Sequence, residues 1–191
     1  MAKSLRPLSY SHRLLSPRVA YLIGARSATA SNIIPISNVT SISTDPELIG
    51  VGVYREWSFV EVLRASSGFT ISLPSVEQLD LTWKLGASYS HYRGNGSGGK
   101  LQEFEAELDQ TWSDVGPVLR DCIGRLECTI ADVLPTTGDH VWFIGSPVKL
   151  ELDESIFDDS GMPKTEFQPV MQVIGNWMTT ASHFMTVDYF R

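Results

Sequence analysis

The sequence LECTIADVLPTTGDHVWFIGSPVKLEL, residues 126–152, gives the clearest indication of the fold class. It contains two runs rich in apolar and β-branched residues, Leu126–Leu134 and Val141–Leu152, which predict two long strands. The segment between them includes Pro135–Asp139, with the Pro, Gly and Asp residues that favour turns. Because so short a connection joins neighbouring strands that run in opposite directions, the stretch predicts a β-hairpin in an antiparallel sheet.

Four segments upstream of the hairpin are also predicted to be strands: Val19–Gly24, Ser31–Ile42, Leu48–Val53 and Phe69–Leu73. Pro35 lacks a backbone N–H, so its strand is expected to lie at a sheet edge or to contain a bulge. Gly50 and Gly52 indicate that another group packs closely against the backbone of the predicted strand Leu48–Val53. Six strands with hairpins and few long crossovers predict a mainly β fold, a six-stranded antiparallel barrel, rather than alternating βαβ units.

Short peripheral helices are predicted to begin at Ser58, at Ser75, at the amphipathic segment Leu101–Leu108 and at Asp114–Pro117. The first two begin with the Ser-x-x-Glu or Ser-x-x-Gln pattern of a capping box. The first is expected to run to about Ala65. The second is expected to bury Val76, Leu79 and Trp83 and to end at Gly86, since glycine favours the left-handed conformation after a helix.

The composition is that of an ordinary globular domain, with 42% hydrophobic and 19% charged residues in a chain of 191. The formal charge of −7 and the lack of a basic run argue against nucleic acid as a partner. No apolar stretch approaches the roughly 20 residues that span a bilayer, so no membrane partner is expected. The N-terminus, MAKSLRP, lacks the apolar core of a secretory signal, and Cys122 and Cys128 are expected to be reduced thiols. We therefore expect a cytoplasmic protein.

The sequence lacks the common catalytic and metal-binding signatures. It has no Gly-x-Ser-x-Gly nucleophile elbow and no Walker loop, and a Rossmann-type nucleotide site is disfavoured. The four histidines are scattered without the paired spacing of zinc ligands, so no metal is expected. His140 follows Gly138 and Asp139 at the start of a predicted strand, where it is either a structural turn residue or part of a site.

The most informative polar segment is Tyr54–Ser58, where a predicted strand ends and a predicted helix begins. The free N–H groups of a helix start favour an anion, and Arg55 can add a charge-assisted hydrogen bond. A phosphate monoester fits such a site. The alternative is that Ser58 only caps its own helix while Arg55 pairs with Glu56 or with solvent.

Two further segments could contribute to a ligand site. Ser37–Ser41 is a polar cluster inside a strand-like segment, and its side chains could donate hydrogen bonds to a heteroaromatic edge; the alternative is an exposed strand face. Gly86–Ser90 has small residues after a predicted helix, which would let a ligand approach the backbone; the alternative is a simple helix end followed by a loop.

Several motifs, in this order and spacing, together resemble the flavin reductase-like FMN-binding family. They are Pro17–Ile23, Ser31–Ser37, Ser43–Val51, Glu61–Pro74, Leu126–Cys128 and Gly138–His140 followed by Gly145. The resemblance covers about residues 14–155. It differs from the family's usual pattern at Phe59, where Thr is usual, at Ser72, where Asn is usual, and in the glycine-rich segment before Lys100.

The resemblance implies a split β-barrel that forms a homodimer, with one FMN per subunit near the dimer interface. It implies one domain over residues 1–191, with a core of about 14–155 and an extension, 156–191, that packs on the barrel or the partner subunit. The implied FMN contacts are Ser37, Asn38, Thr40, Ser41, Tyr54, Arg55, Ser58, Gly86, Ala87, Ser88 and Lys100. His140 is implied to help position a nicotinamide, and no side chain need act as a covalent catalyst.

The expected function is therefore that of an FMN-binding oxidoreductase. It would take hydride from NAD(P)H and pass electrons to free flavin, ferric complexes or another small acceptor, while the protein positions the cofactor and controls access. Two alternatives stay open: an FMN-holding electron carrier without its own NAD(P)H turnover, and a relative that has lost the cofactor.

Overall fold

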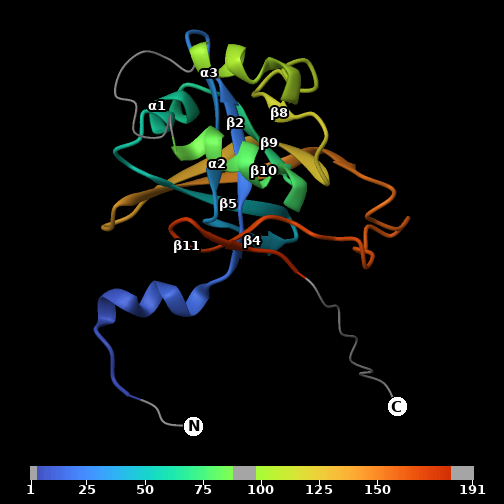
Figure 1. Ribbon diagram of the computed structural model, residues 1–191. Helices are drawn as coiled ribbons and strands as arrows, with labels where there is room; N and C mark the ends of the chain where they lie inside the picture. Colours follow the sequence, from blue (N-terminus) through green and yellow to red (C-terminus); the bar gives the residue numbers. More distant parts are fainter. Residues whose placement is uncertain (1–3, 88–97, 182–191) are drawn as a thin grey trace.

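The computed structural model describes residues 4–87 and 98–181. A seven-stranded antiparallel sheet, in the order β3-β2-β6-β9-β10-β5-β4, forms its centre (Figure 1). These strands are β2 (Tyr21–Arg26), β3 (Ser31–Ile36), β4 (Val39–Thr44), β5 (Glu47–Tyr54), β6 (Gly68–Leu73), β9 (Gly124–Pro135) and β10 (His140–Leu152). The mainly β, antiparallel class is confirmed. The seventh strand arises because the predicted strand Ser31–Ile42 is interrupted at Ser37 and Asn38.

The two edges of this sheet are joined directly by the chain. β3 and β4 are the edge strands, and only Ser37 and Asn38 separate them in sequence. The Gly52 N–H donates to the Asn38 carbonyl at 2.8 Å, which holds the connection against β5. The sheet therefore curls so that its edges approach each other, as in a split barrel. Pro35 lies in the edge strand β3, as its missing donor predicts.

The long hairpin is formed as predicted. β9 and β10 pair from Val141 opposite Pro135 to Leu152 opposite Gly124, with two register shifts that bend the pair. β10 also pairs with β5, where the Trp142 ring covers Gly50 and Gly52. A Cβ at Gly52 would come within 3.0 Å of that ring, so Trp142 is the closely packed group that the two glycines indicate.

The helices are short and lie outside the sheet. They are η1 (Leu8–Leu15), α1 (Phe59–Arg64), η2 (Val76–Gln78), α2 (Leu79–Ala87), α3 (Gly98–Glu103) and η3 (Glu105–Glu107), where η denotes a 3-10 helix. The box at Ser75 and Gln78 is formed, but Ser58 makes no capping hydrogen bond with its side chain, so that box is wrong. None of the described helices is long and apolar enough to cross a membrane.

The predicted end and buried face of α2 are wrong. The helix continues through Gly86, whose absent Cβ would meet the Pro35 ring at 2.5 Å. Gly86 therefore does not end the helix. Its lack of a side chain lets α2 pack closely on β3. Trp83 is 43% exposed, and Thr82 and Leu85 are buried in its place.

The helix predicted at Asp114–Pro117 is also wrong. This segment is irregular and leads into β8 (Val118–Leu119), which pairs with β7 (Leu108–Asp109). Its backbone is held by the sheet, since the buried Thr70 hydroxyl donates to the Pro117 carbonyl at 2.7 Å. The Arg26 N–H of β2 also donates to the Val115 carbonyl at 2.6 Å. These bonds to β2 and β6 take the place of hydrogen bonds within a helix, and the spacing of residues in the sequence does not reveal them.

Two hydrophobic clusters hold these layers together. The larger one fills the barrel and includes Ile23, Val53, Phe59, Phe69 and Phe143. The smaller one lies between the sheet and the helical layer and buries Leu101, Phe104 and Leu108. The single helix predicted over Leu101–Leu108 is wrong in its extent, because α3 ends at Glu103 and Leu108 lies in β7.

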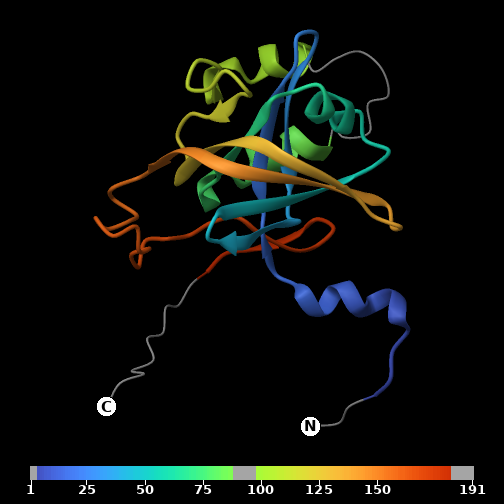
Figure 2. The same cartoon turned by 180° about the vertical axis from the view of Figure 1, so that it is seen from behind.

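The C-terminal part packs on the barrel over the residues that the structure describes. β11 (Met171–Ile174) pairs with β1 (Arg18–Val19) and with β12 (Trp177–Thr179). Val170 is buried, and its carbonyl accepts from the Ala20 N–H at 2.9 Å. Seen from both sides, this segment passes below the central sheet, and η1 stands apart from it (Figures 1 and 2).

Candidate functional site

A hollow of about 270 Å³ lies where α2, the end of β3 and the β11–β12 segment meet the turn after β5. Its lining includes Pro35, Ser37, Trp57, Thr82, Gly86 and Gln172. Its volume is just below the range of about 300–1,000 Å³ that is usual for small-molecule sites. Three segments predicted from the sequence, 37–41, 54–58 and 86–88, each contribute a residue to it.

The hollow combines apolar walls with a few polar groups. The Ser37 hydroxyl donates to Oε1 of Gln172 at 2.8 Å, and Nε2 of Gln172 donates to the Gly175 carbonyl at 3.0 Å. Thr82 is 1% exposed, and its buried Oγ1 makes no hydrogen bond with any described residue. Because burying a hydroxyl without a partner costs free energy, this atom points to a missing ligand or water.

A row of aromatic rings leads from the β9–β10 turn to the hollow. The Tyr54 ring contacts His140 at 5.9 Å and Trp57 at 6.0 Å between centroids, both edge to face. Nδ1 of His140 lies 2.7 Å from Oδ1 of Asp139, and this hydrogen bond holds the pKa of the Asp139 carboxyl below its usual value. His140 is therefore fixed beside Tyr54, with its ring partly exposed.

Arg55 is bound by the hairpin. Its Nη2 donates to the Thr136 carbonyl at 3.0 Å and to the Gly138 carbonyl, while its N–H donates to the Asp139 carbonyl at 2.8 Å. Nε and Nη1 make no hydrogen bond among the described residues. The side chain is exposed and can still donate to an anion, so it neither pairs with Glu56 nor lies free in solvent.

The start of α1 offers fewer backbone donors than its sequence predicts. The Val60 N–H donates to the Trp57 carbonyl at 3.0 Å, and the Glu61 N–H donates to the Ser58 carbonyl at 3.2 Å. Ser58 is exposed and has helical dihedral angles. An anion at this turn would therefore depend on Arg55 and the Ser58 hydroxyl more than on free amides.

The remaining residues of the predicted 37–41 cluster lie away from this hollow. Oδ1 of Asn38 accepts from Nη1 of Arg18 at 2.6 Å, which ties the β3–β4 connection to β1. Thr40 and Ser41 are exposed on β4 and line a different, mostly apolar groove. The chain turns at Ser37 and Asn38, between the end of β3 and the start of β4, so the cluster does not act as one surface.

Lys100 is placed under β3. It is 1% exposed, and its ammonium donates to Oδ1 of Asn32 at 3.1 Å and to the Ile33 carbonyl. Burial lowers its pKa to about 7. Ala87 is the last residue of α2, and Ser88 lies outside the described residues.

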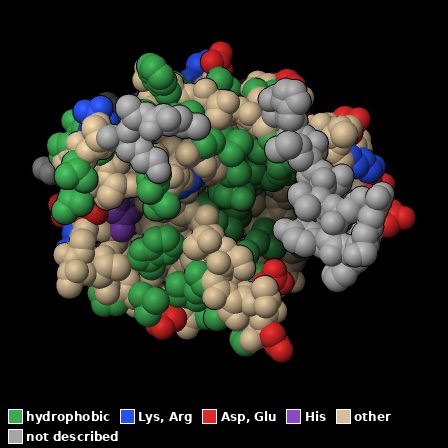
Figure 3. Space-filling model, turned by 90° about the horizontal axis from the view of Figure 1, so that it is seen from below, with side chains coloured by type: hydrophobic (Ala, Val, Ile, Leu, Met, Phe, Trp, Pro, Cys, Tyr) green, Lys and Arg blue, Asp and Glu red, His purple; other side chains and the backbone are tan. Residues whose placement is uncertain are grey.

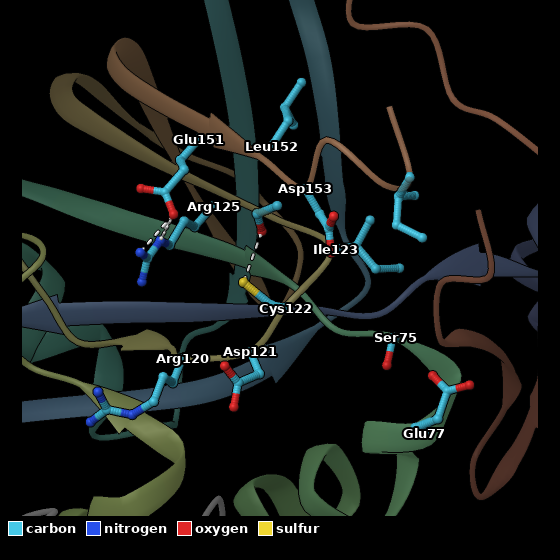
Figure 4. Close-up of a pocket in the computed structure, with 12 residues that line it drawn as sticks. Ser75, Glu77, Arg120, Asp121, Cys122, Ile123, Arg125, Glu151, Leu152 and Asp153 are labelled. Carbon is cyan, nitrogen blue, oxygen red and sulfur yellow. Dashed lines mark hydrogen bonds and ion pairs between the residues drawn. The ribbon is translucent and has the colours of Figure 1, made fainter. Parts of the chain in front are cut away.

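Another cavity, of about 470 Å³, lies at the far ends of β9 and β10 and contains none of the predicted residues (Figure 4). Its charged groups largely satisfy one another, since Nε of Arg125 donates to Oε1 of Glu151 at 2.9 Å. The Cys122 thiol donates to the Gly124 carbonyl at 3.3 Å, and burial raises its pKa to about 11. This thiol therefore stays protonated at neutral pH. Cys122 and Cys128 are both free, as expected.

Trp57, Thr82 and Gln172 are among the residues of the hollow that sequence reasoning missed. Trp57 lies inside the predicted segment Tyr54–Ser58, but only Arg55 and Ser58 of that segment have side chains expected to bind an anion. Thr82 is missed because the predicted buried face of its helix includes Trp83, and Thr82 is not on that face. Gln172 had no local signal, since only the pairing of β11 with β1 brings it beside Ser37.

The protein is a mainly β protein with a curled antiparallel sheet and a hollow beside its edge strand β3. The chain belongs to the flavin reductase like domain family, whose model matches residues 13–170. An uncharacterised protein of Pyrococcus abyssi is 26% identical over 156 residues, covering 82% of this chain and 86% of that protein.

The chain is also similar to a named reductase and to a solved structure. The NADH-dependent FMN reductase AsuE2 of Streptomyces nodosus subsp. asukaensis is 29% identical over 142 residues, which cover 74% of this chain and 72% of that protein. The FMN-binding protein of Thermus thermophilus, solved with bound 1-cyclohex-2-enone, has a TM-score of 0.77 and 24% identity, with 98% of each chain covered. This structural likeness supports the fold alone.

Proposed function

We propose that this protein is an FMN-binding oxidoreductase that takes hydride from NAD(P)H and delivers electrons to free flavin, a ferric complex or another small acceptor. Membership of the flavin reductase-like family and similarity to an NADH-dependent FMN reductase support the reaction class. The protein would act as a cytoplasmic homodimer. The observation that carries the proposal is the hollow where Ser37, Trp57 and Gly86 meet beside the unsatisfied hydroxyl of Thr82.

The residues of the hollow fit a flavin. Its apolar walls, which include Pro35 and Trp57, suit a flat ring system, while Ser37, Thr82 and Gln172 supply hydrogen-bonding groups at one side. When bound, FMN supplies the hydride and electron chemistry. The protein's own residues bind the ring, exclude water from it and control access to it.

The charged end of the cofactor is proposed to lie at Arg55 and Ser58. Arg55 is exposed and already oriented by two carbonyls of the hairpin, so little rotamer freedom remains to be lost on binding. Tyr54 and His140 would flank the opening, with His140 positioning the nicotinamide. Asn38 and Lys100 would support the site by holding the β3–β4 connection and β3 itself.

The first test is a visible absorption spectrum of the freshly purified protein, followed by oxidation of NADH and NADPH with added FMN, riboflavin and a ferric chelate. Flavin bands with turnover support the proposal. Flavin bands with negligible turnover would identify an electron carrier instead. No flavin bands and no binding of added FMN would identify a relative that has lost the cofactor.

The second test concerns the phosphate. Arg55→Gln should weaken FMN binding about 10-fold or more, since a hydrogen bond to a charged group contributes about 1.5–3 kcal/mol, but leave riboflavin binding unchanged. Arg64→Gln, an exposed change on α1 with one weak ion pair to Glu61, is the matched control. Equal loss for both flavins would place the phosphate away from Arg55.

A further inference from the structure

Gln172 determines how the Ser37 hydroxyl can bond to a ligand. Nε2 of Gln172 donates to the Gly175 carbonyl at 3.0 Å, and because a carbonyl only accepts, this bond sets the orientation of the amide group. The amide oxygen, Oε1, therefore faces Ser37 and lies 2.8 Å from its hydroxyl oxygen. Since Oε1 can only accept, Ser37 donates its single hydroxyl hydrogen to it. Toward the hollow, Ser37 then has only acceptor capacity left.

Thr82 has the capacity that Ser37 lacks. Its Oγ1 is buried and has no hydrogen-bond partner among the described residues, so its hydroxyl hydrogen is available to a ligand in the hollow. An acceptor at Ser37 and a donor at Thr82 together match a ligand edge on which an N–H group stands beside a carbonyl. A cyclic imide, with the sequence of groups O=C–NH–C=O, has such an edge.

The rest of the hollow favours an uncharged group. The lining that the structure describes contains no charged side chain, and Pro35, Trp57 and Met178 supply apolar surface. On the side of the molecule where β11 lies, hydrophobic side chains gather in the middle of the view and most acidic ones stand near its outline (Figure 3). A phosphate in the hollow would lack a counter-charge from this lining, whereas a neutral imide needs only hydrogen bonds.

We propose that Gln172 makes the hollow selective for a ligand with an imide N–H, which in FMN is the N3–H group. The inference rests on the proposed function, because it concerns FMN in the same hollow. N3 carries the only N–H of the oxidised flavin ring, so it is the ring group that an acceptor can bind. Gln172 acts through Ser37 and is therefore a positioning residue. The match to the family model ends at residue 170, so membership of the family does not itself predict this role.

The test compares the binding of FMN and of N3-methyl-FMN, in which a methyl group replaces that hydrogen, by fluorescence titration. The parent protein should bind FMN at least about tenfold more tightly, because the analogue leaves the Ser37 oxygen unpaired. Ser37→Ala removes the acceptor, so the preference should fall below about threefold through weaker binding of FMN. Gln172→Met frees Ser37 to donate to a ring carbonyl, which both flavins carry, and should lower the preference to a similar value.

Two further variants and a folding check complete the test. Gln168→Met makes the same change at an exposed residue before β11 and should keep the parent's preference. The double variant Ser37→Ala/Gln172→Met should match Ser37→Ala, because Gln172 acts through Ser37. Circular dichroism spectra of all variants should match that of the parent protein.

Three results would overturn the proposal while leaving the proposed function in place. They are equal binding of the two flavins by the parent protein, a preference for FMN that survives in Ser37→Ala or in Gln172→Met, and a loss in Gln172→Met that is equal for both flavins with the preference kept, which would show a purely structural role. A parent protein that binds neither flavin would contradict the proposed function itself and this inference with it.

Discussion

At the scale of single residues, a change at the Thr82 hydroxyl should affect FMN binding and protein stability in different ways. Its Oγ1 is buried without a partner among the described residues, so Thr82→Val removes an unsatisfied polar atom while keeping the shape of the side chain. We expect the free energy of unfolding without FMN to stay the same or rise by about 1 kcal/mol, while FMN affinity falls about fivefold. Urea unfolding and fluorescence titration measure the two quantities.

Thr44→Val, at the exposed end of β4, is the control for the general effect of this change. It should alter neither quantity measurably. A drop in stability for Thr82→Val, with unchanged affinity for FMN, would show that the hydroxyl has a structural partner instead.

Lys100 makes stability depend on pH. Burial lowers its pKa from 10.5 to about 7, whereas the unfolded chain keeps the ordinary value. Between these values the unfolded state binds more protons, so the free energy of unfolding should rise with pH, by at most about 1.4 kcal/mol per unit. Lys100→Met should abolish the rise measured by urea unfolding from pH 7 to 8.5, and Lys84→Met on the exposed face of α2 should keep it.

At the scale of elements, two polar side chains of β6 hold the irregular segment before β8. Thr70 donates to the Pro117 carbonyl, and the Leu119 N–H donates to the fully buried Ser72 hydroxyl at 2.9 Å. Ser72→Ala leaves that N–H unsatisfied and should lower the free energy of unfolding by about 1–3 kcal/mol. Ser41→Ala, on the exposed strand β4, should change it by less than about 0.5 kcal/mol. Equal effects would contradict this role.

The strands were predictable because their signals are local. Alternating or continuous apolar runs and the turn residues at Pro135–Asp139 identify the hairpin, and Gly50 and Gly52 indicate the close approach that Trp142 makes. Gly86 and the segment at Asp114–Pro117 were misassigned because distant parts of the chain decide their conformation. From the local sequence, a glycine inside a helix cannot be told from a glycine that follows one. Only the contact between Gly86 and Pro35, which is distant in sequence, distinguishes the two.

At the scale of the whole molecule, the site was predictable only in pieces. Ser37, Trp57 and Gly86 lie in segments that the sequence singles out, yet nothing local shows that they share one hollow. Thr40 and Ser41 lie in the same segment as Ser37 but face another groove, because the chain turns between β3 and β4. Gln172 belongs to the C-terminal extension, which follows the expected core of about residues 14–155. Its position depends on the pairing of β11 with β1.

Because the hollow is shared by β3, α2 and the β11 segment, a ligand bound there would stabilise the whole fold rather than one element. FMN at 100 times its dissociation constant should add about 2.7 kcal/mol to the free energy of unfolding. For a chain of this size that corresponds to a rise in Tm of about 5–10 °C, measured by thermal melts followed by circular dichroism. Riboflavin at the same concentration, which lacks the phosphate, should give a smaller rise. A Tm that FMN leaves unchanged, or that both flavins raise equally, would contradict the cofactor or the proposed role of its phosphate, respectively.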